Sequence, residues 1–246
     1  MVHKELKIMR IMYTKKYINN LSMNARYEKK FLINFKSFYE VDNLIKINKY
    51  NFKKTYSDRF VNNIYFDSNE LNNYKDNIEG NTNRKKVRIR WYGNLKGKVI
   101  KPKLEIKIKR GEIGYKEVIS IGSFNFDKNF SININGFIKE LELINKKHII
   151  DNLYATLVNR YRRRYYESFD KKFRITLDEK VEYYPFFNKK ISFFKKNKDE
   201  NSVILEIKYD LDSSKNVDNI TNQFPFRLTK SSKYVSGIER IKQYNF

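Results

Sequence analysis

Short runs that alternate apolar and charged residues recur along the chain and predict β-strands. In 87–91, apolar side chains at 87, 89 and 91 are separated by Arg88 and Arg90. Successive side chains of a strand point to opposite faces, so such a run has one apolar and one charged face. By this pattern and by their β-branched and aromatic content, strands are predicted at 26–33, 61–67, 85–92, 101–110, 114–121, 156–166, 172–179 and 202–209.

Other segments have helical spacing or the composition of a link. Apolar positions three and four apart predict helices at 35–50, 68–78, 137–153 and 231–243, with Asp67 or Ser68 capping the second. The short link 93–98 contains glycine, as a hairpin requires, and lacks the spacing of a phosphate-binding loop. Segments 122–135 and 185–200 are interpreted as an irregular link and an insertion. We predict one α+β domain over 24–246 after a basic extension, 1–23.

The charged faces carry mostly arginine and lysine, with isolated carboxylates such as Glu28, Glu105 and Glu206. One interpretation is an ordinary antiparallel sheet with one face in water. However, like charges that face each other across strands destabilise a sheet unless an anion lies between them. The second interpretation is a closed antiparallel barrel that is lined by these cations, with helices 35–50, 137–153 and 231–243 packed on its apolar outside.

Composition favours an anionic partner. The 246 residues include 52 Lys and Arg against 28 Asp and Glu, a formal net charge of +24. Nucleic acid, a membrane surface or phosphate-rich molecules would suit such a charge, although a codon bias towards lysine could also produce it. Cysteine is absent, which excludes disulfides, thiolate catalysis and iron–sulfur clusters. His3 and His148 are the only histidines, so a divalent metal would need oxygen ligands, which suit magnesium or manganese.

No apolar run is long enough to span a membrane, and the N-terminus lacks the apolar stretch of a signal peptide. We therefore expect a cytoplasmic protein without an integral membrane segment. Whether the chain docks on a membrane or on another protein stays open.

Several segments, in order, resemble the VTC domain, the polyphosphate polymerase domain of the vacuolar transporter chaperone complex. They are RYEKKFLI at 26–33, IYFDSNELNNYKDNIEG at 64–80, RKKVRIRWYG at 84–93, LEIKIKRGEIGYKE at 104–117, NRYRRRYYES at 159–168, FRITLDE at 173–179, VILEIKY at 203–209 and TKSSKY at 229–234. The resemblance implies a barrel of the wider CYTH group of triphosphate tunnel enzymes. It also implies transfer of the ATP γ-phosphate onto polyphosphate, with Mn²⁺ or Mg²⁺ as the cofactor.

The resemblance also implies site residues, from the R-x-R-W-Y strand, the Y-x-R pair and the K-x-S-K element among others. Catalytic roles are expected for Arg88, Arg90, Lys107, Arg163, Arg174 and Glu206. Substrate-binding roles are expected for Lys30, Lys116, Tyr161, Lys208, Lys230, Ser232 and Lys233. Metal ligation is expected for Glu206, helped by Glu28 or Glu105; for Glu105, a cross-strand salt bridge is the alternative role.

Two other functions stay open at this point. The CYTH hydrolases carry E-x-E-x-K on the first strand, where this chain has Arg26 in place of the first glutamate. Attack by an ionised phosphate needs no base, whereas hydrolysis must activate water, so this difference favours a polymerase over a metal-dependent tripolyphosphatase or nucleoside triphosphatase. The third reading is a module that binds polyphosphate or nucleic acid without catalysis; the preferred reading requires ATP and polyphosphate and no nucleic acid.

Overall fold

A computed structural model describes residues 26–243 except 112, 129, 131–149, 151 and 188–189. The predicted extension 1–23, most of the predicted helix 137–153 and His148 lie outside the described residues.

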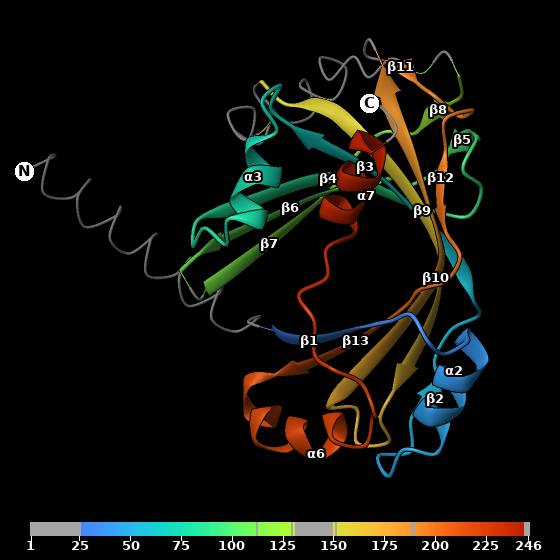
Figure 1. The fold of residues 1–246 in the computed structure, drawn as a ribbon, viewed down its shortest axis with the longest axis vertical. Coiled ribbons are helices and arrows are strands. Elements are labelled where there is room, and N and C mark those ends of the chain that lie inside the picture. Colours follow the sequence, from blue (N-terminus) through green and yellow to red (C-terminus); the bar gives the residue numbers. More distant parts are fainter. Residues whose placement is uncertain are drawn as a thin grey trace, which may run out of the picture.

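A single antiparallel sheet bends into a deep curve and forms the body of the fold (Figure 1). In spatial order its main strands are β1 (Arg26–Ile33), β13 (Val203–Asp210), β10 (Phe173–Phe187), β9 (Tyr154–Glu167), β3 (Arg59–Asp67), β4 (Arg84–Tyr92), β6 (Lys103–Arg110) and β7 (Ile113–Ser120). Three short strands extend it: β2 (Lys53–Lys54) pairs with β9, while β11 (Lys190–Ile191) and β12 (Asn197–Asp199) pair with β10. The predicted strands are therefore confirmed, with shifted ends.

Two predicted segments differ in detail. The segment 185–200 is largely part of the sheet, because β10 continues to Phe187 and β11 and β12 fold back on it. Gly97–Val99, which overlaps the predicted hairpin link 93–98, forms β5 and pairs with β8 (Phe124–Phe126), which lies in the segment 122–135 that was predicted to be irregular. Alternation within single runs could not reveal these strands, since β5, β8, β11 and β12 are only two or three residues long.

Two apolar regions of the convex face of the sheet are covered by other elements. Helices α2 (Phe38–Lys46) and α6 (Val217–Thr221) pack on β1, β13 and β10, where Phe31 and Leu205 are buried. Beyond them, β5 and β8 cover the apolar face of β4 and β6, and Trp91 is 2% exposed there. A capping box between Ser37 and Glu40 fixes the start of α2. These clusters explain why Phe31, Leu205 and Trp91 all lie on the convex side of their strands.

Helix α3 (Asn72–Ile78) begins later than the predicted residue 68. The Asp67 carboxylate accepts hydrogen bonds from the amides of Asn73 and Tyr74 at 2.9 and 3.0 Å. The Tyr234 hydroxyl also donates to that carboxylate, so Asp67 connects α3 with helix α7 (Lys233–Lys242). Asp67 thus caps the helix, as predicted, although from a distance.

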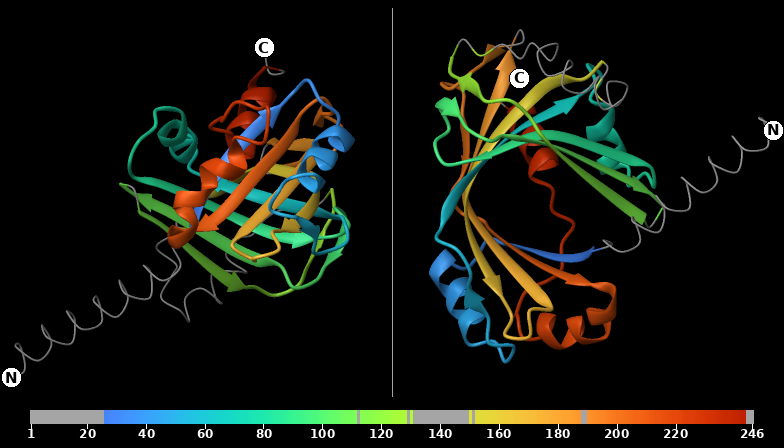
Figure 2. Two further views of the ribbon diagram at one scale, coloured as in Figure 1. Left: turned by 90° about the horizontal axis from the view of Figure 1, so that it is seen from below. Right: turned by 180° about the vertical axis from the view of Figure 1, so that it is seen from behind.

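Helix α7 lies inside the curve of the sheet, which corrects the prediction that 231–243 covers the outside (Figure 2). Tyr234 and Ile238 pack against Val61 and Tyr161, on the face that also carries the cations. Gly237 allows the close approach: a Cβ atom there would lie 2.5 Å from Leu157 Cδ2. The tyrosines on this face form an apolar surface between the charged positions, and α7 packs on it. Strand alternation alone does not distinguish such a surface from one that faces solvent.

The end strands β1 and β7 are not paired with each other in the described strand order, so the predicted closed barrel is instead an open curve. The segment 225–232, between α6 and α7, crosses the open side (Figure 2). The Thr229 amide donates to the Lys30 carbonyl at 2.8 Å, and the Leu32 amide donates to Thr229 Oγ1 at 2.9 Å. This segment therefore occupies the outer edge of β1, where a closing strand would otherwise pair. None of the described helices has the length and apolarity needed to cross a membrane.

Candidate active site

The strand register brings the predicted cations together on the concave face. Arg88 of β4 lies opposite Glu105 of β6, and Lys107 of β6 lies opposite Lys116 of β7. On the other side of the curve, Lys30 of β1 lies opposite Glu206 of β13. Each strand places every second residue on this face. The charged positions of neighbouring strands therefore lie side by side and form one charged surface.

Glu105 is the centre of the first cluster. Its carboxylate accepts from Arg88 Nε at 2.8 Å and lies 2.6 Å from Arg88 Nη2. Lys116 Nζ is 2.9 Å from the other oxygen, and Arg90 Nη1 is 3.6 Å from it. Burial disfavours the charged carboxylate, but these cations outweigh burial and hold the pKa of Glu105 well below its usual value. Glu105 thus forms the cross-strand salt bridges that the sequence analysis gave as the alternative to metal ligation.

Lys30 and Glu206 form the second cluster. Lys30 Nζ lies 3.0 Å from Glu28 and 3.2 Å from Glu206. Lys208 Nζ is 3.0 Å from Glu206, and Arg163 Nη2 is 3.8 Å from it. Burial disfavours the charged form of Glu206, but Lys208 and Lys30 lower its pKa well below the ordinary value. The carboxylate is therefore ionised and is shared by cations from three strands.

Asp178 organises the third cluster, below α7. Arg163 donates two hydrogen bonds to its oxygens, from Nε at 2.6 Å and from Nη2 at 2.7 Å. Lys233 Nζ, from the first turn of α7, is 2.6 Å from the same carboxylate and lies over the ring of Tyr161. Burial opposes ionisation of Tyr161, but Arg163 and Arg90 lower the pKa of its hydroxyl to about 8. This hydroxyl accepts from Arg90 Nη2 at 3.4 Å, which joins the first and third clusters.

Lys86 is a functional candidate that the sequence interpretation missed. It precedes Arg88 by two positions on β4 and donates to Ser232 Oγ at 2.9 Å. Burial and the nearby charges of Lys30, Arg88 and Lys107 lower its pKa to about 7. Among the described ion pairs none includes Lys86, so a lysine stands among cations where an anion would relieve the repulsion. Lys86, Arg88 and Arg90 follow one another at intervals of two residues, and this spacing could have placed Lys86 on the same face from the sequence alone.

Two predicted residues lie outside these clusters. Arg174 shares the concave face, opposite Lys208, but its side chain is 52% exposed and lies 3.2 Å from Glu167. Lys230 is exposed on the segment that crosses the open side, and among the described residues its side chain forms no ion pair with a predicted site residue. Besides Lys86, the sequence interpretation gave no role to Asp178, Asn63 or Tyr65. Asn63 and Tyr65 hold Arg90 and Arg88 by hydrogen bonds of 2.9 and 3.3 Å.

The carboxylates fit a divalent metal only in part. Within the described residues, no three acidic or histidine side chains gather closely enough to hold a metal alone. Glu28 and Glu206 converge on Lys30 Nζ, whereas Glu105 is held by Arg88, Arg90 and Lys116. Because Mg²⁺ commonly binds one or two carboxylates together with substrate phosphates, Glu28 and Glu206 are a sufficient pair. Of the two helpers expected for Glu206, Glu28 therefore lies beside it at Lys30, whereas Glu105 lies among other cations; the metal ligands stay a prediction.

A curved antiparallel sheet that gathers arginine and lysine on its inner face defines a site for phosphate-rich anions. Comparison with protein families agrees with this class: the VTC domain matches residues 25–242. The chain therefore belongs to the VTC domain family.

Comparison with curated proteins gave no match. A solved structure from Pyrococcus horikoshii OT3 is 14% identical with a TM-score of 0.49, over 89% of this chain and 99% of the other. A candidate adenylate cyclase from Bacillus halodurans is 12% identical with a TM-score of 0.48, over 85% and 94%. A candidate adenylyl cyclase from Hippeastrum, described as having a dominant triphosphatase activity, is 12% identical with a TM-score of 0.45, over 87% and 96%. All three TM-scores are below 0.5, so the likeness carries no conclusion about function.

Proposed function

We propose that the protein is a polyphosphate polymerase that transfers the γ-phosphate of ATP onto the end of a polyphosphate chain with the help of Mn²⁺ or Mg²⁺. The observation that carries the proposal is the gathering of Lys30, Arg88, Arg90, Lys116, Arg163, Lys208 and Lys233 around a few carboxylates on one concave face. Membership of the VTC domain family supports it.

Binding of the triphosphate falls to the arginines. Arg88 is held by Glu105 and Tyr65, and Arg90 by Asn63 and Tyr161, so both guanidinium groups are fixed before the substrate arrives. A preorganised arginine fork matches two phosphate oxygens and need not reorder when charge develops in the transition state. Lys30, Lys86, Lys107 and Lys116 line the same face and would neutralise the phosphates of the acceptor chain.

In the transfer step, a terminal oxygen of the acceptor chain forms a bond to the γ-phosphorus while the bond between that phosphorus and the β–γ bridging oxygen breaks. The electron pair of the broken bond leaves with ADP. A metal ion bound by Glu28 and Glu206 would supply further positive charge on the phosphate oxygens. The attacking oxygen is already ionised, so the protein's task is to position and neutralise charge.

The carboxylates favour polymerisation over hydrolysis. A general base needs a pKa near the working pH. In Glu105, Asp178 and Glu206 the neighbouring cations lower the pKa, which makes all three weak bases for activating water. A tripolyphosphatase of the same fold is therefore the second reading, and a binding module without catalysis is the third.

The deciding experiment incubates the protein with ATP and Mn²⁺ and measures ADP, free phosphate and long-chain polyphosphate separately. ADP with polymer is the expected result. ADP with free phosphate and no polymer would show that the protein is a hydrolase and not a polymerase. The absence of all three products would contradict any enzymatic role in phosphoryl transfer. Arg88→Gln should abolish product formation, whereas Arg110→Gln is a matched control: Arg110 is exposed at the end of β6, an even number of positions from the buried Ile106.

A further inference from the structure

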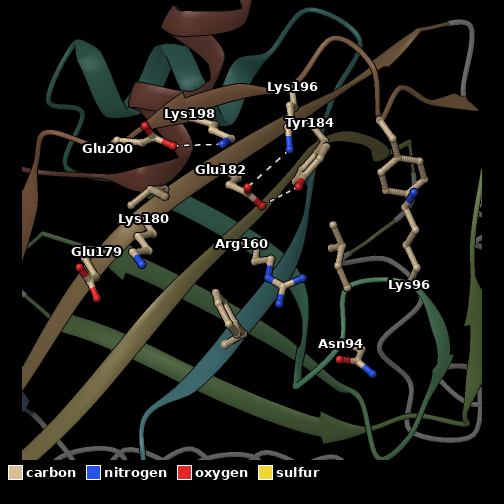
Figure 3. A pocket seen from close by; sticks show the side chains of 14 residues that line it. Asn94, Lys96, Arg160, Glu179, Lys180, Glu182, Tyr184, Lys196, Lys198 and Glu200 are labelled. Carbon is tan, nitrogen blue, oxygen red and sulfur yellow. Dashed lines mark hydrogen bonds and ion pairs between the residues drawn. The ribbon is translucent and has the colours of Figure 1, made fainter.

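A second group of cations lies on the convex side of the sheet, around a groove of about 960 Å³ (Figure 3). Its walls come from β3, β9, β10, the link after β4 and the region around β12. This groove is separate from the concave face, because Arg160 alternates with Tyr161 along β9. We call it the outer groove; its charged lining residues are Lys96, Arg160, Glu179, Lys180, Glu182, Lys196, Lys198 and Glu200.

The carboxylates of the outer groove are already occupied. Glu179 is bound by Arg162. Glu182 accepts from the Tyr184 hydroxyl at 2.6 Å and lies 3.8 Å from Lys196, while Glu200 lies 3.0 Å from Lys198. These carboxylates therefore do not neutralise the remaining cations of the lining.

Arg160, Lys180 and Lys96 are those remaining cations. In the described part of the chain, no carboxylate forms an ion pair with any of them. The Arg160 guanidinium lies 3.9 Å from the centre of the Phe60 ring, which fixes its plane and leaves its N–H donors for a ligand. Lys96 Nζ lies 4.1 Å from the ring of Phe193, and Lys180 projects from a β-bulge.

The segments that carry the cations of the outer groove are held in place by hydrogen bonds and by a specific backbone conformation. Asn62 and Trp91 donate to the carbonyl of Asn94, which pins the link that carries Lys96. Lys180 holds a φ of +52°, a conformation that non-glycine residues adopt at a cost and that recurs at functional sites. Three cations from three segments are thus held around one recess.

We propose that the outer groove is a second anion site, which binds a small phosphate-bearing ligand through Arg160, Lys180 and Lys96. Arginine forks match phosphate oxygens, and lysine adds charge without demanding geometry. A concave recess of this volume suits a small molecule. The site stands on residues other than those of the proposed polymerase, so it does not depend on that function.

Titration calorimetry with inorganic pyrophosphate, without metal, tests the site. The wild type should bind at two sites. Loss of one charge-assisted contact costs about tenfold or more in affinity, so Arg160→Gln and Lys180→Gln should each weaken one site by that factor. Arg88→Gln should weaken only the other site. Lys49→Gln, at an exposed lysine after α2, is the control for net charge.

A second readout keeps the test independent of folding defects. Saturating pyrophosphate should protect Lys180 and Lys96, but not Lys49, from acetylation, as measured by mass spectrometry of the wild type. The proposal is overturned by a single site that Arg88→Gln abolishes, by equal weakening in Lys49→Gln, or by absent protection. If only the groove variants weaken binding, the outer groove stands and the concave site of the proposed polymerase fails.

Discussion

Lys107 of β6 reaches Glu28 of β1, with 3.5 Å between Nζ and Oε1, although these strands lie near opposite ends of the sheet order. The contact spans the open side of the curve. It also links the cluster around Glu206 to the strand that carries Glu105, because Lys30 binds both Glu28 and Glu206. The inner face is therefore one electrostatic unit, in which removing a charge at one strand affects the others.

Replacement of Glu105 should destabilise the protein. Glu105→Gln leaves Arg88, Arg90 and Lys116 without their shared carboxylate, and loss of one partner from a buried ion pair costs about 3–5 kcal/mol. Because pyrophosphate can replace that negative charge, it should raise the Tm of Glu105→Gln more than that of the wild type. Thermal unfolding with and without pyrophosphate measures both effects. An equal rise in the two proteins would contradict the role assigned to Glu105.

Replacement of Asp178 should have a similar cost and a recognisable remedy. Asp178→Asn leaves Arg163 and Lys233 unpaired beneath α7, and we expect a loss of about 3–5 kcal/mol in the free energy of unfolding. The double variant Asp178→Asn/Lys233→Gln should recover part of the loss, since one uncompensated cation is gone. Urea unfolding of the single and double variants decides this. Additive losses would show that the three groups do not act together.

Acid should weaken the same cluster. Burial disfavours the charged form of Asp178, yet Arg163 and Lys233 lower its pKa below the usual 3.8. A carboxyl whose pKa is depressed by folding contributes stability above its unfolded pKa and loses it as the pH falls below that value. The free energy of unfolding should therefore fall below about pH 4 in the wild type, and less steeply in Asp178→Asn.

Lys86 should give anion binding a pH dependence near neutrality. Its pKa of about 7 means that the protonated form, which attracts phosphate, is lost between pH 6 and 8. Tyr161, with a pKa of about 8, gains negative charge at the upper end of that range and acts in the same direction. Pyrophosphate affinity at the concave site should fall with rising pH, and Lys86→Met should flatten the fall between pH 6 and 7.5.

Stability should change in the opposite sense. Between pH 7 and the ordinary lysine value of 10.5, the unfolded chain binds more protons at Lys86 than the folded chain does. The free energy of unfolding should then rise with pH, by at most about 1.4 kcal/mol per pH unit from this group. Denaturation across this range compares the wild type with Lys86→Met, and equal slopes would mean that Lys86 is protonated throughout.

The metal dependence should separate the three predicted ligands. Glu28→Gln and Glu206→Gln should raise the Mn²⁺ concentration for half-maximal polyphosphate synthesis, because these carboxylates converge on one point at Lys30. Glu105→Gln should leave that concentration unchanged while it lowers turnover through Arg88 and Arg90. A shift in the Glu105→Gln variant as well would contradict this assignment and make Glu105 a metal ligand.

Alternation predicted most of the sheet because burial of one face is a local property of each strand. It correctly placed Arg163 and Tyr161 on one face and Arg162 and Arg164 on the other, where Arg164 binds Asp58 and Asp42. The position of α7 could not be read this way. Its apolar residues would fit either face of the sheet. The apolar surface on the inner face, where α7 packs, forms only when Val61, Tyr65 and Tyr161 come together from separate strands.

Site residues that follow a motif along one strand were predicted from the sequence. Site residues whose role depends on contacts with distant segments were missed. Arg88 and Arg90 are two apart on one strand, so their shared face follows from the sequence. The role of Asp178 depends on Lys233, 55 residues away. The low pKa of Lys86 depends on its burial and on charges that β1 and β6 bring to it. For the same reason the sequence could not decide whether Glu28 or Glu105 lies beside Glu206: Glu28 shares Lys30 with Glu206, whereas Glu105 is held by Arg88.

The central claim is that the inner face of the curved sheet holds the phosphate chain. A crystal structure of the protein with tripolyphosphate tests it most directly. The account predicts phosphate oxygens within hydrogen-bonding distance of Arg88, Arg90 and Arg163 on the concave face. Tripolyphosphate bound only on the convex side, with those arginines still paired as they are now, would contradict it.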